Sequence, residues 1–530
     1  MRILQVVHGF PPHEWAGTEL VTLHLSQALR ARGHQVTVFT RTAAPGAAEF
    51  SVREERLDGL EVVRVVNNYM HTSSFRLLYD NPFFDEAFVR LLDRVQPEVI
   101  HFQHLQHLSV SLITLAAALG HPTVLSLHDF FFPCHLINLV DTRGRLCSGP
   151  EEGERCVSCL QDYAPPEEVR RRFSLMGQIL QLPDLILTPS TFLAQKILSY
   201  FPLLREKVRP VTLGVKLVPD IARERAPGAP LRILYVGVLL PHKGAHVLIE
   251  ALKGLPSDTL EVSVYGAVVS SEQSYADRLR EAAQGLPVHF YEPYPHDQIG
   301  SILSRHDVLV MPMIWEETFS LLTREALMAG LPVIAARRGA LPEVVQDGMN
   351  GLLFEPENAA DLRRCLARLI AEPRLVEQLR DVDPQVKTVE EYAREIEGVY
   401  AEVCAGPYRV HSLQQRLAAQ YRAYAALQQE SERLRAALHE LSTQYTAVQH
   451  HRDCLRAEKA AAEEERSRAL ATARELDGIL NLREAQLCER NARLEAIYAS
   501  TTWKLYRGYA ALTHALFHRP LGKLKQWLVR

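Results

Sequence analysis

The strongest chemical signal in this sequence is a pair of glutamates, Glu317 and Glu325, on either side of a predicted helix start near Ser320. A buried apolar strand (308–312) precedes them, and a Gly-Leu-Pro turn (330–332) follows. Free N–H groups at a helix start, with its partial positive charge, bind phosphate oxygens. Carboxylates beside such a site are poorly suited to phosphate, but they accept hydrogen bonds from sugar hydroxyls. The spacing therefore predicts a site for a diphosphate joined to a sugar, with two solvated surface glutamates as the alternative.

Histidines follow two predicted strands in the first half of the chain. His101 and His104 lie at the end of the run 99–102, and His128 directly follows the run 123–127. A lone histidine is more often structural than catalytic. Because the carboxyl ends of parallel strands meet at one edge of a sheet, two histidines at consecutive strand ends favour a functional role for His128.

A glycine-bearing loop (10–19) connects the first predicted strand to a helix. Gly17 in this loop has no Cβ, so its backbone amide can approach a phosphate closely. An ordinary strand-to-helix turn explains the same residues about equally well.

Four of the eight cysteines fall within 26 residues. They are Cys134, Cys147, Cys156 and Cys159. Four thiols that include one C-x2-C pair can form a tetrahedral structural zinc site, which would fix the segment after His128. Free buried thiols are the alternative, since only one pair has the spacing of a zinc knuckle. A catalytic metal is not expected.

The elements that must position these residues are those of two successive α/β domains. Short β-rich runs alternate with helical patterns, as in a parallel, doubly wound sheet. The predicted strands of the first domain are 3–7, 36–40, 62–65, 99–102, 123–127 and 185–188, and those of the second are 231–237, 262–266, 288–291, 308–312 and 333–335. Such domains face each other across a cleft, with ligands at the carboxyl ends of the strands.

The predicted boundaries follow changes in composition. Residues 1–217 form the first domain, 218–230 a Pro- and Gly-bearing linker, and 231–404 the second domain. Residues 408–500 hold a heptad repeat of about ten units, which predicts a coiled coil and hence a homo-oligomer, with a single solvated helix as the alternative.

The last thirty residues (501–530) contain six Lys and Arg, no Asp or Glu, and two tryptophans. A basic, aromatic segment of this kind can lie on an anionic membrane surface, or it can dock on a protein partner. If the segment binds a membrane, we expect the protein to lie peripherally on the inner face of that membrane.

The whole-chain composition limits the class of protein. Of 530 residues, 47% are apolar and 23% charged, which excludes a disordered or collagen-like chain. The net charge of −4 shows no excess of positive charge of the kind that binds nucleic acid. No stretch reaches the ~18 consecutive apolar residues of a membrane span, and the first residues are too soon polar for a signal peptide. We therefore expect a cytoplasmic protein with reduced cysteines.

The segment from Trp315 to Val333 resembles the E-x7-E region of family-4 glycosyltransferases, retaining enzymes of the GT-B architecture that use nucleotide sugars. The resemblance covers about residues 1–404. It is specific, because several separated motifs occur in the same order as in that family. It implies that Glu325 binds the ribose and that Glu317 contacts hydroxyls of the donor sugar. It further implies that backbone amides of Ser320, Leu321 and Leu322 hold the diphosphate, and that His128 touches the donor sugar.

The segment from Tyr235 to Gly244 resembles the family's Gly-Arg-Leu…Lys-Gly loop. The resemblance implies that Gly237 and Lys243 bind the donor and that Lys243 stabilises the departing diphosphate. Val238 stands where the family has an arginine, so one cation is missing unless Arg324 or His242 replaces it. Ala16 similarly replaces the first glycine of the family's Gly-Gly-x-Glu loop, which Gly17 continues.

The sequence thus predicts a retaining glycosyltransferase that moves a sugar from a nucleotide-diphosphate donor to a glycan or lipid-linked acceptor, in surface polysaccharide or glycan biosynthesis. The resemblance implies that catalysis requires no metal cofactor. Another nucleotide-sugar enzyme, such as a 2-epimerase, or a phosphorylase fits the two glutamates less well. A catalytically weak pseudo-transferase that acts as a scaffold remains the non-enzyme alternative, because of Val238.

Overall fold

The computed structural model describes residues 1–70, 74–218, 228–269, 272–383, 385–406 and 408–499. Its first domain is built on an eight-stranded sheet with the order β3-β4-β2-β1-β5-β6-β7-β8. The strands are β1 (Arg2–Val6), β2 (Gln35–Thr42), β3 (Val52–Leu57), β4 (Leu60–Val66), β5 (Val99–Phe102), β6 (Thr123–Ser126), β7 (Leu185–Thr188) and β8 (Val208–Pro210). All neighbours are parallel except β3, which pairs antiparallel with β4. The predicted α/β sheet is confirmed.

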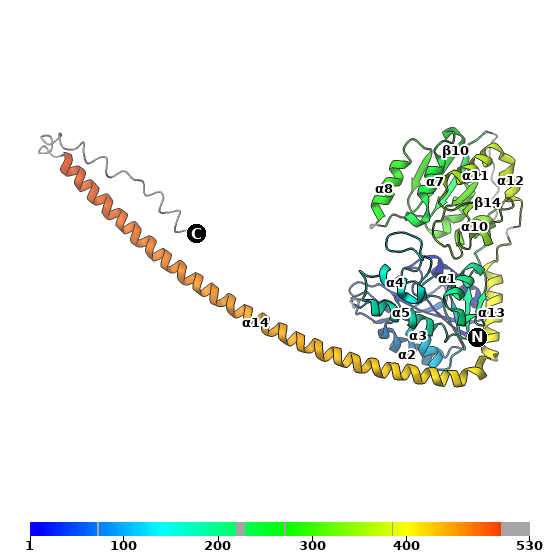
Figure 1. Ribbon diagram of the computed structural model, residues 1–530, viewed down its shortest axis with the longest axis horizontal. Helices are drawn as coiled ribbons and strands as arrows, with labels where there is room; N and C mark the ends of the chain where they lie inside the picture. The colour runs from blue at the N-terminus through cyan, green and yellow to red at the C-terminus, as the bar shows by residue number, and fades with distance from the viewer. Residues whose placement is uncertain (71–73, 219–227, 270–271, 384, 407, 500–530) are drawn as a thin grey trace. The chain divides into compact units, whose positions relative to one another are not determined.

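Helices cover both faces of this sheet (Figure 1). They are α1 (Gly17–Ala31), α2 (Asp85–Val95), α3 (Ser111–Ala118), α4 (Glu154–Cys159), α5 (Pro166–Ile179) and α6 (Thr191–Tyr200). Apolar residues of α2, α3, α5 and α6 pack on one face, and those of α1 pack on the other. Alternate strand residues face the two layers, since Leu4 belongs to the first cluster and Ile3 to the second.

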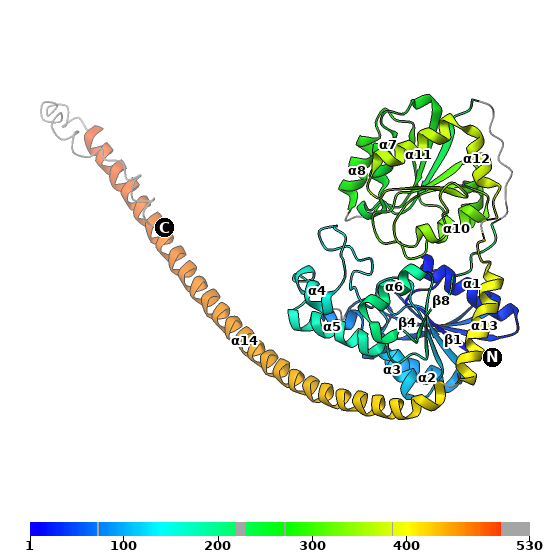
Figure 2. The same ribbon diagram turned by 45° about the vertical axis from the view of Figure 1, so that its right-hand side comes forward.

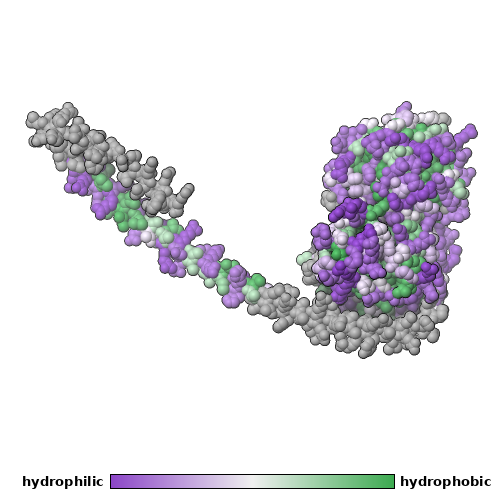
Figure 3. Space-filling model, in the orientation of Figure 1, coloured by the Kyte–Doolittle hydropathy of each residue, from purple (hydrophilic) through white to green (hydrophobic). Residues whose placement is uncertain are grey.

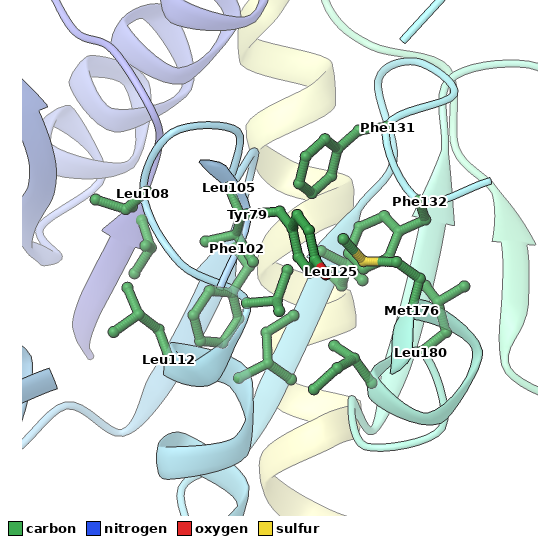
Figure 4. Packing of buried hydrophobic residues seen from close by; sticks show 14 of the residues in the cluster. Tyr79, Phe102, Leu105, Leu108, Leu112, Leu125, Phe131, Phe132, Met176 and Leu180 are labelled. Atoms are coloured by element: carbon green, nitrogen blue, oxygen red, sulfur yellow. The ribbon is translucent and has the colours of Figure 1, made fainter. Parts of the chain in front are cut away.

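The core beneath α2, α3 and α5 continues into the segment after β6 (Figure 4). Phe132 lies beside Met176 there, the Phe131 ring packs 5.3 Å from the Phe132 ring, and both belong to the same buried cluster as Phe102 and Leu125. Burial of such a side chain contributes ~1.5–3 kcal/mol. The residues just beyond the carboxyl end of β6 are therefore anchored in the core.

The second domain has a parallel six-stranded sheet with the order β11-β10-β9-β12-β13-β14 (Figure 2). Its strands are β9 (Leu231–Val236), β10 (Leu260–Tyr265), β11 (Val288–Tyr291), β12 (Val308–Met311), β13 (Val333–Ala336) and β14 (Gly351–Phe354). Its helices are α7 (Ala245–Leu252), α8 (Gln273–Ala282), α9 (Ile299–Ser304), α10 (Leu321–Met328), α11 (Ala359–Ala371) and α12 (Pro373–Arg380). Helices α9 and α10 pack on one face, and the other four on the opposite face.

Helix α13 (Val389–Ala405) differs from the sequence prediction, which placed residues 389–404 in the second domain. Its apolar residues, including Tyr392, Ile396 and Tyr400, pack against α1 and the first sheet. A bridge between Val215 and Thr388 holds the two crossing segments side by side. The amphipathic pattern of α13 predicts a helix but cannot say which sheet it covers, because either sheet offers an apolar face.

A single helix of 92 residues, α14 (Tyr408–Ala499), follows. The chain divides into two compact units, residues 1–423 and 424–530. Exposed apolar residues recur along the described part of α14 among polar ones (Figure 3), and they include the heptad positions Val448, Leu455, Leu476, Leu480 and Leu487. The predicted helix is present, whereas its pairing into a coiled coil stays a prediction. The basic segment 501–530 lies outside the described residues.

Among the described residues, no helix combines the length and the hydropathy that crossing a membrane requires.

Candidate functional site

The loop before α10 meets the carboxyl edge of the first sheet through Thr318. The Thr318 hydroxyl donates to the carbonyl oxygen of His128 at 2.7 Å, and Ser190 Oγ donates to the Thr318 carbonyl oxygen at 2.7 Å. Thr318 directly follows Glu317, so residues predicted from separate motifs in separate domains come together at this point. Sequence reasoning did not assign a role to Thr318 or Ser190, although Thr318 lies within the motif that it singled out.

The glycine loop of the first domain reaches the same place. A Cβ at Gly17 would lie 3.4 Å from a methyl carbon of Leu321, the first residue of α10. Phe319 and Leu321 also pack with the apolar cluster of the first domain. The predicted donor-binding positions Gly17 and Leu321 are therefore neighbours.

His128 is buried at the end of β6 and hydrogen bonded within the domain. Its Nε2 donates to Gln103 Oε1 at 2.8 Å. Burial, reinforced by the nearby His104, lowers the pKa of His128 to about 4. The imidazole is thus neutral at physiological pH, and its orientation is set by Gln103.

Gln103 begins a chain of buried polar side chains that runs away from the site. Gln103 Nε2 donates to Gln5 Oε1 at 3.0 Å, and Gln5 Nε2 donates to the Tyr400 hydroxyl at 3.1 Å. The same hydroxyl lies 2.7 Å from His101 Nδ1, while His101 Nε2 lies 2.8 Å from Ser126 Oγ. Helix α13 thereby contacts the groups behind His128. Of these groups, only His101 was picked out by the sequence, and it serves this internal network.

A second polar group lies beside His128. His104 Nε2 is 3.0 Å from Asp129 Oδ2, and the rings of His104 and His8 lie 4.3 Å apart. His8 Nε2 is 3.2 Å from Glu19 Oε1, so the end of β1 and the start of α1 join the same cluster. Burial lowers the pKa of His8 well below its usual value and raises that of Glu19.

Lys243 and Glu317 face each other in the second domain. Lys243 ends a short 3-10 helix (Pro241–Lys243) after β9, and its Nζ lies 3.8 Å from Glu317 Oε2. The ammonium group also lies 4.2 Å from the centre of the Trp315 ring, a cation–π contact. The structure thus brings together the two residues predicted to act on the donor sugar and its diphosphate.

The start of α10 has an unusual backbone at Ser320, where φ is +63°. The Ser320 side chain accepts a hydrogen bond from the Thr323 N–H at 3.2 Å and so caps the helix. The first-turn N–H groups of a helix have no partner within the helix, so those of Leu321 and Leu322 suit an anion.

The missing family arginine has no replacement in the two residues that the sequence suggested. The Val238 side chain is exposed. Arg324 is buried, stacks on the Phe319 ring and donates to the Phe319 carbonyl oxygen, so it supports the loop from behind. Burial, with Lys243 as a second cause, lowers the pKa of His242 to about 4 and leaves it neutral.

Glu325 lies one helical turn into α10 and contacts His296 of the second domain. His296 Nε2 donates to Glu325 Oε1 at 3.0 Å, and this hydrogen bond raises the pKa of His296. The His24 ring of the first domain lies 6.5 Å from that of His296. Glu325 is therefore held in place at the edge of the second sheet.

Glycines allow the backbone segments of this site to approach one another. Gly339 has φ +60°, and a Cβ there would lie 2.2 Å from the Glu317 carbonyl oxygen. The neighbouring Ala340 N–H donates to this oxygen at 2.7 Å. A Cβ at Gly266 would similarly meet the Gly237 carbonyl oxygen at 2.2 Å. The position of Glu317 thus depends on Gly339, and that of Gly237 on Gly266.

The four clustered cysteines lie in the excursion between β6 and α5, and all four are half-buried. Among the described residues, no three His, Cys, Asp or Glu side chains are arranged as metal ligands. The predicted zinc site stays a prediction at this point.

Two family models match successive parts of the chain. The model of Glycosyltransferase Family 4 matches residues 15–218, and that of Glycosyl transferases group 1 matches residues 219–386. Together they span both sheets except β1, and every site residue described above except Gln5, His8 and Tyr400.

Curated relatives match over both domains. A glycogen synthase of Mycobacterium tuberculosis is 25% identical over 394 residues, which cover 70% of this chain and 87% of the relative. A D-inositol 3-phosphate glycosyltransferase of Corynebacterium aurimucosum is 26% identical over 391 residues, with 70% and 84% covered.

Solved structures share the fold. Sucrose-phosphate synthase from Thermosynechococcus elongatus superposes with a TM-score of 0.58 at 19% identity, covering 76% of this chain and 99% of that chain. Anabaena Alr3699/HepE, in complex with UDP and glucose, gives 0.54 at 17% identity, with 76% and 100% covered.

Proposed function

Because this chain belongs to glycosyltransferase family 4 and has the GT-B fold, we propose that it transfers a sugar, with retention, from a nucleotide-diphosphate donor to a glycan or lipid-linked acceptor. One observation carries the proposal: Thr318 joins the His128 strand end to the Glu317 loop at 2.7 Å. The site therefore draws on both domains, as transfer between a donor and an acceptor requires. The pathway that we propose is the synthesis of a surface polysaccharide or another glycan.

The proposed donor lies with its diphosphate at the start of α10, where the amides of Leu321 and Leu322 and the Lys243 ammonium offset its charge. Such preorganised donors can each contribute ~3 kcal/mol to the transition state. Gly17 and Gly237 provide close backbone approach, Glu325 binds the ribose, and Glu317 and His128 orient the sugar. His128, with a pKa of about 4, acts as a neutral hydrogen-bonding group and not as a general acid.

The proposed reaction keeps the acceptor on the same face of the sugar as the leaving diphosphate. The bond between the anomeric carbon and the diphosphate oxygen breaks, and a bond between the anomeric carbon and the acceptor oxygen forms. A phosphate oxygen of the departing nucleoside diphosphate takes the proton of the acceptor hydroxyl. No protein base is needed for this step, and the proposal requires no metal cofactor.

Incubation of the full chain with a panel of nucleotide sugars, with and without glycan or lipid-linked acceptors, tests this function. We expect release of the nucleoside diphosphate and an acceptor product whose anomeric configuration, read by NMR, equals that of the donor. An inverted product would overturn retention. Absence of both donor binding and nucleotide release across the panel would overturn the enzyme.

Val238 favours a second candidate, a catalytically weak transferase whose main task is to scaffold a glycan-assembly complex. Lys243 would then be the sole cationic side chain described at the diphosphate position, and the rate would suffer. The turnover of a Val238→Arg variant separates the two candidates. A large gain in turnover over the wild-type chain supports the catalytically weak transferase. An active wild-type chain whose turnover the substitution does not raise supports the transferase.

The proposed partners beyond substrates involve the last 123 residues (408–530). We propose that α14 pairs with a second copy through its heptad positions, which place Val448, Leu455 and Leu476 in exposed positions on the helix. We further propose that the basic segment 501–530 holds the protein peripherally on the inner face of a membrane.

A further inference from the structure

The first turn of α6 in the first domain is capped by a carboxylate of the second domain. The Thr191 N–H donates to Glu343 Oε2 at 3.0 Å, and the Phe192 N–H donates to Glu343 Oε1 at 2.5 Å. The N–H groups of a first helical turn have no partner within the helix. The next one, that of Leu193, donates to the Ser190 hydroxyl at 3.1 Å. The start of α6 therefore takes part of its capping from the other domain.

Both sides of this contact are fixed within their own domains. Leu193 and Ile197 of α6 are buried in the core of the first domain. Glu343 ends a short 3-10 helix (Leu341–Glu343) after β13, and Leu341 is buried in the core of the second domain. A carboxylate suits the position, because it accepts from two N–H groups at once and lies at the positive end of the helix dipole. The contact therefore ties one rigid element to another.

Helix α6 and its N-cap also contact the two residues that flank Glu317. Lys196 Nζ lies 3.5 Å from Glu316 Oε1, and Ser190 Oγ donates to the Thr318 carbonyl oxygen at 2.7 Å. Both contacts cross from the first domain to the loop before α10. The position of Glu317 relative to the first domain therefore depends on where α6 lies.

The segment that carries Glu343 holds the same loop from within the second domain. The Glu343 N–H donates to the Ala340 carbonyl oxygen at 3.2 Å, and the Ala340 N–H donates to the Glu317 carbonyl oxygen at 2.7 Å. Hydrogen bonds thus lead from α6 through Glu343 and Ala340 to Glu317. A displacement of Glu343 from α6 would be passed to the Glu317 backbone.

We propose that Glu343 is a positioning residue of the transferase, whose contact with α6 sets the place of the Glu317 loop relative to His128. Glu343 touches no substrate in this role and acts through Glu317. The two segments that cross between the domains meet at one place, and domains joined in this way move relative to each other unless contacts between them hold them. The inference rests on the proposed function, in which Glu317 and His128 orient the donor sugar.

Two substitutions in the full chain weaken this contact from opposite sides. Glu343→Ala removes the acceptor of both hydrogen bonds. Thr191→Pro removes one of the two donors and keeps α6, because proline is favoured at the first position of a helix and the preceding Ser190 is extended, with φ −149° and ψ 155°. The control Glu377→Ala replaces an exposed glutamate of α12 in the second domain.

Steady-state kinetics and amide hydrogen exchange, read by mass spectrometry, test the proposal. We expect Glu343→Ala to lower kcat roughly tenfold and Thr191→Pro roughly threefold, as for the loss of charge-assisted hydrogen bonds, with a smaller change in donor affinity. Exchange in the segment 316–323 should become faster in both variants but not in the control. The double variant should be no slower than Glu343→Ala, because both changes remove the same contact.

The exchange measurement separates failure of this inference from failure of the proposed function. Faster exchange confined to the first turn of α6, with wild-type kcat, would show that Glu343 only caps the helix and would overturn the positioning role. Wild-type exchange in 316–323 in both variants would overturn it as well. A wild-type chain without turnover would contradict the transferase instead, and the exchange of 316–323 would still show whether Glu343 holds the loop.

Discussion

At the scale of single residues, His128 is limited by its surroundings to one kind of role. Its Nε2 is engaged by Gln103, and its pKa of about 4 keeps it neutral during turnover. A neutral imidazole can orient a hydroxyl, but it cannot deliver a proton at physiological pH. This is consistent with a reaction in which the acceptor proton leaves with the phosphate.

Replacement of Glu325 tests the proposed ribose contact. Glu325→Ala should weaken nucleotide binding by ~1–3 kcal/mol, about five- to 150-fold, because it leaves a hydroxyl without an acceptor. The same change should lower the pKa of His296, since the hydrogen bond to Glu325 raises it. Calorimetry measures the first effect and NMR titration the second. Glu261→Ala is the control, because Glu261 is an exposed residue of β10. Unchanged nucleotide affinity in Glu325→Ala would contradict the ribose contact.

Glu317 and His128 should affect turnover more than affinity. We expect Glu317→Gln and His128→Ala to reduce kcat by roughly tenfold to 100-fold with a smaller change in donor affinity, because their contacts orient the reacting sugar. Steady-state kinetics and donor titrations on the same preparations separate the two quantities. Turnover at the wild-type rate in both variants would contradict the assignment.

The sequence singled out the proposed site residues but not the residues that hold them in place. Glu317, Glu325 and Lys243 could be singled out because they lie in strand–loop–helix motifs that resemble those of family-4 glycosyltransferases. Gln103, Thr318 and Tyr400 could not, because a polar residue next to an apolar run looks the same whether it faces a ligand or another part of the chain. Gln103 offered one signal, its place between His101 and His104 at a strand end.

At the scale of elements, the loop before α10 depends on a glycine in the next connection. Gly339→Ala should displace the Glu317 backbone, since the new Cβ would lie 2.2 Å from its carbonyl oxygen. We expect a fall in thermal midpoint together with weaker donor binding. Gly348→Ala is the matched control, because Gly348 also has a positive φ, of +76°, but nothing lies within 4 Å of the new Cβ. It should cost only the ~1 kcal/mol of left-handed backbone strain and leave donor binding intact. Equal donor binding in both variants would contradict the argument.

The predicted strands with apolar side chains are confirmed, and the strands that the sequence missed have identifiable reasons. β3 (Val52–Leu57) is an edge strand with charged residues at four of its six positions, so it has no apolar alternation to detect. β8 has only three residues, one of them a proline, and β14 begins at a glycine, a residue type that is depleted in strands. For α13, the pattern gave the helix but not its partner sheet, since tertiary packing decides that choice.

At the scale of the whole molecule, histidines buried in neutral form should make stability fall in mild acid. Burial lowers the pKa of six of them to about 3 or 4, namely His24, His101, His107, His128, His135 and His242. The unfolded chain binds these protons first, so stability is fully present above pH ~6.5 and declines toward pH 4 by up to ~1.4 kcal/mol per pH unit per histidine. Asp85, whose pKa burial raises to about 6, opposes this in part.

Thermal midpoints at pH 7, 6 and 5 measure this dependence. His101→Gln should flatten it, because His101 is fully buried, whereas the exposed His289→Gln should not. A midpoint that is constant or rises toward pH 5 would contradict the prediction.

Truncation after Gly406 tests the proposed roles of the C-terminal residues. Because α13 is retained, the product should fold, bind donor and sediment as a monomer, while the full chain self-associates. The full chain should also cosediment with vesicles that contain anionic lipid, since each Lys or Arg near such a surface contributes ~1 kcal/mol. Equal vesicle binding by the two proteins, or a monomeric full chain, would count against these roles.

The return of α13 to the first sheet makes the second domain an insert with adjoining ends. Val215 N–H donates to the Lys387 carbonyl oxygen at 2.9 Å, and Val389 N–H donates to the Val215 carbonyl oxygen at 3.1 Å, so the chain leaves and re-enters at one place. The second domain is thus bounded by two neighbouring points of the backbone, and the matched segment 219–386 lies between them. A recombination event or a designed swap at these points would exchange the second domain in one step, and it would leave the first domain and α13 joined as they are now.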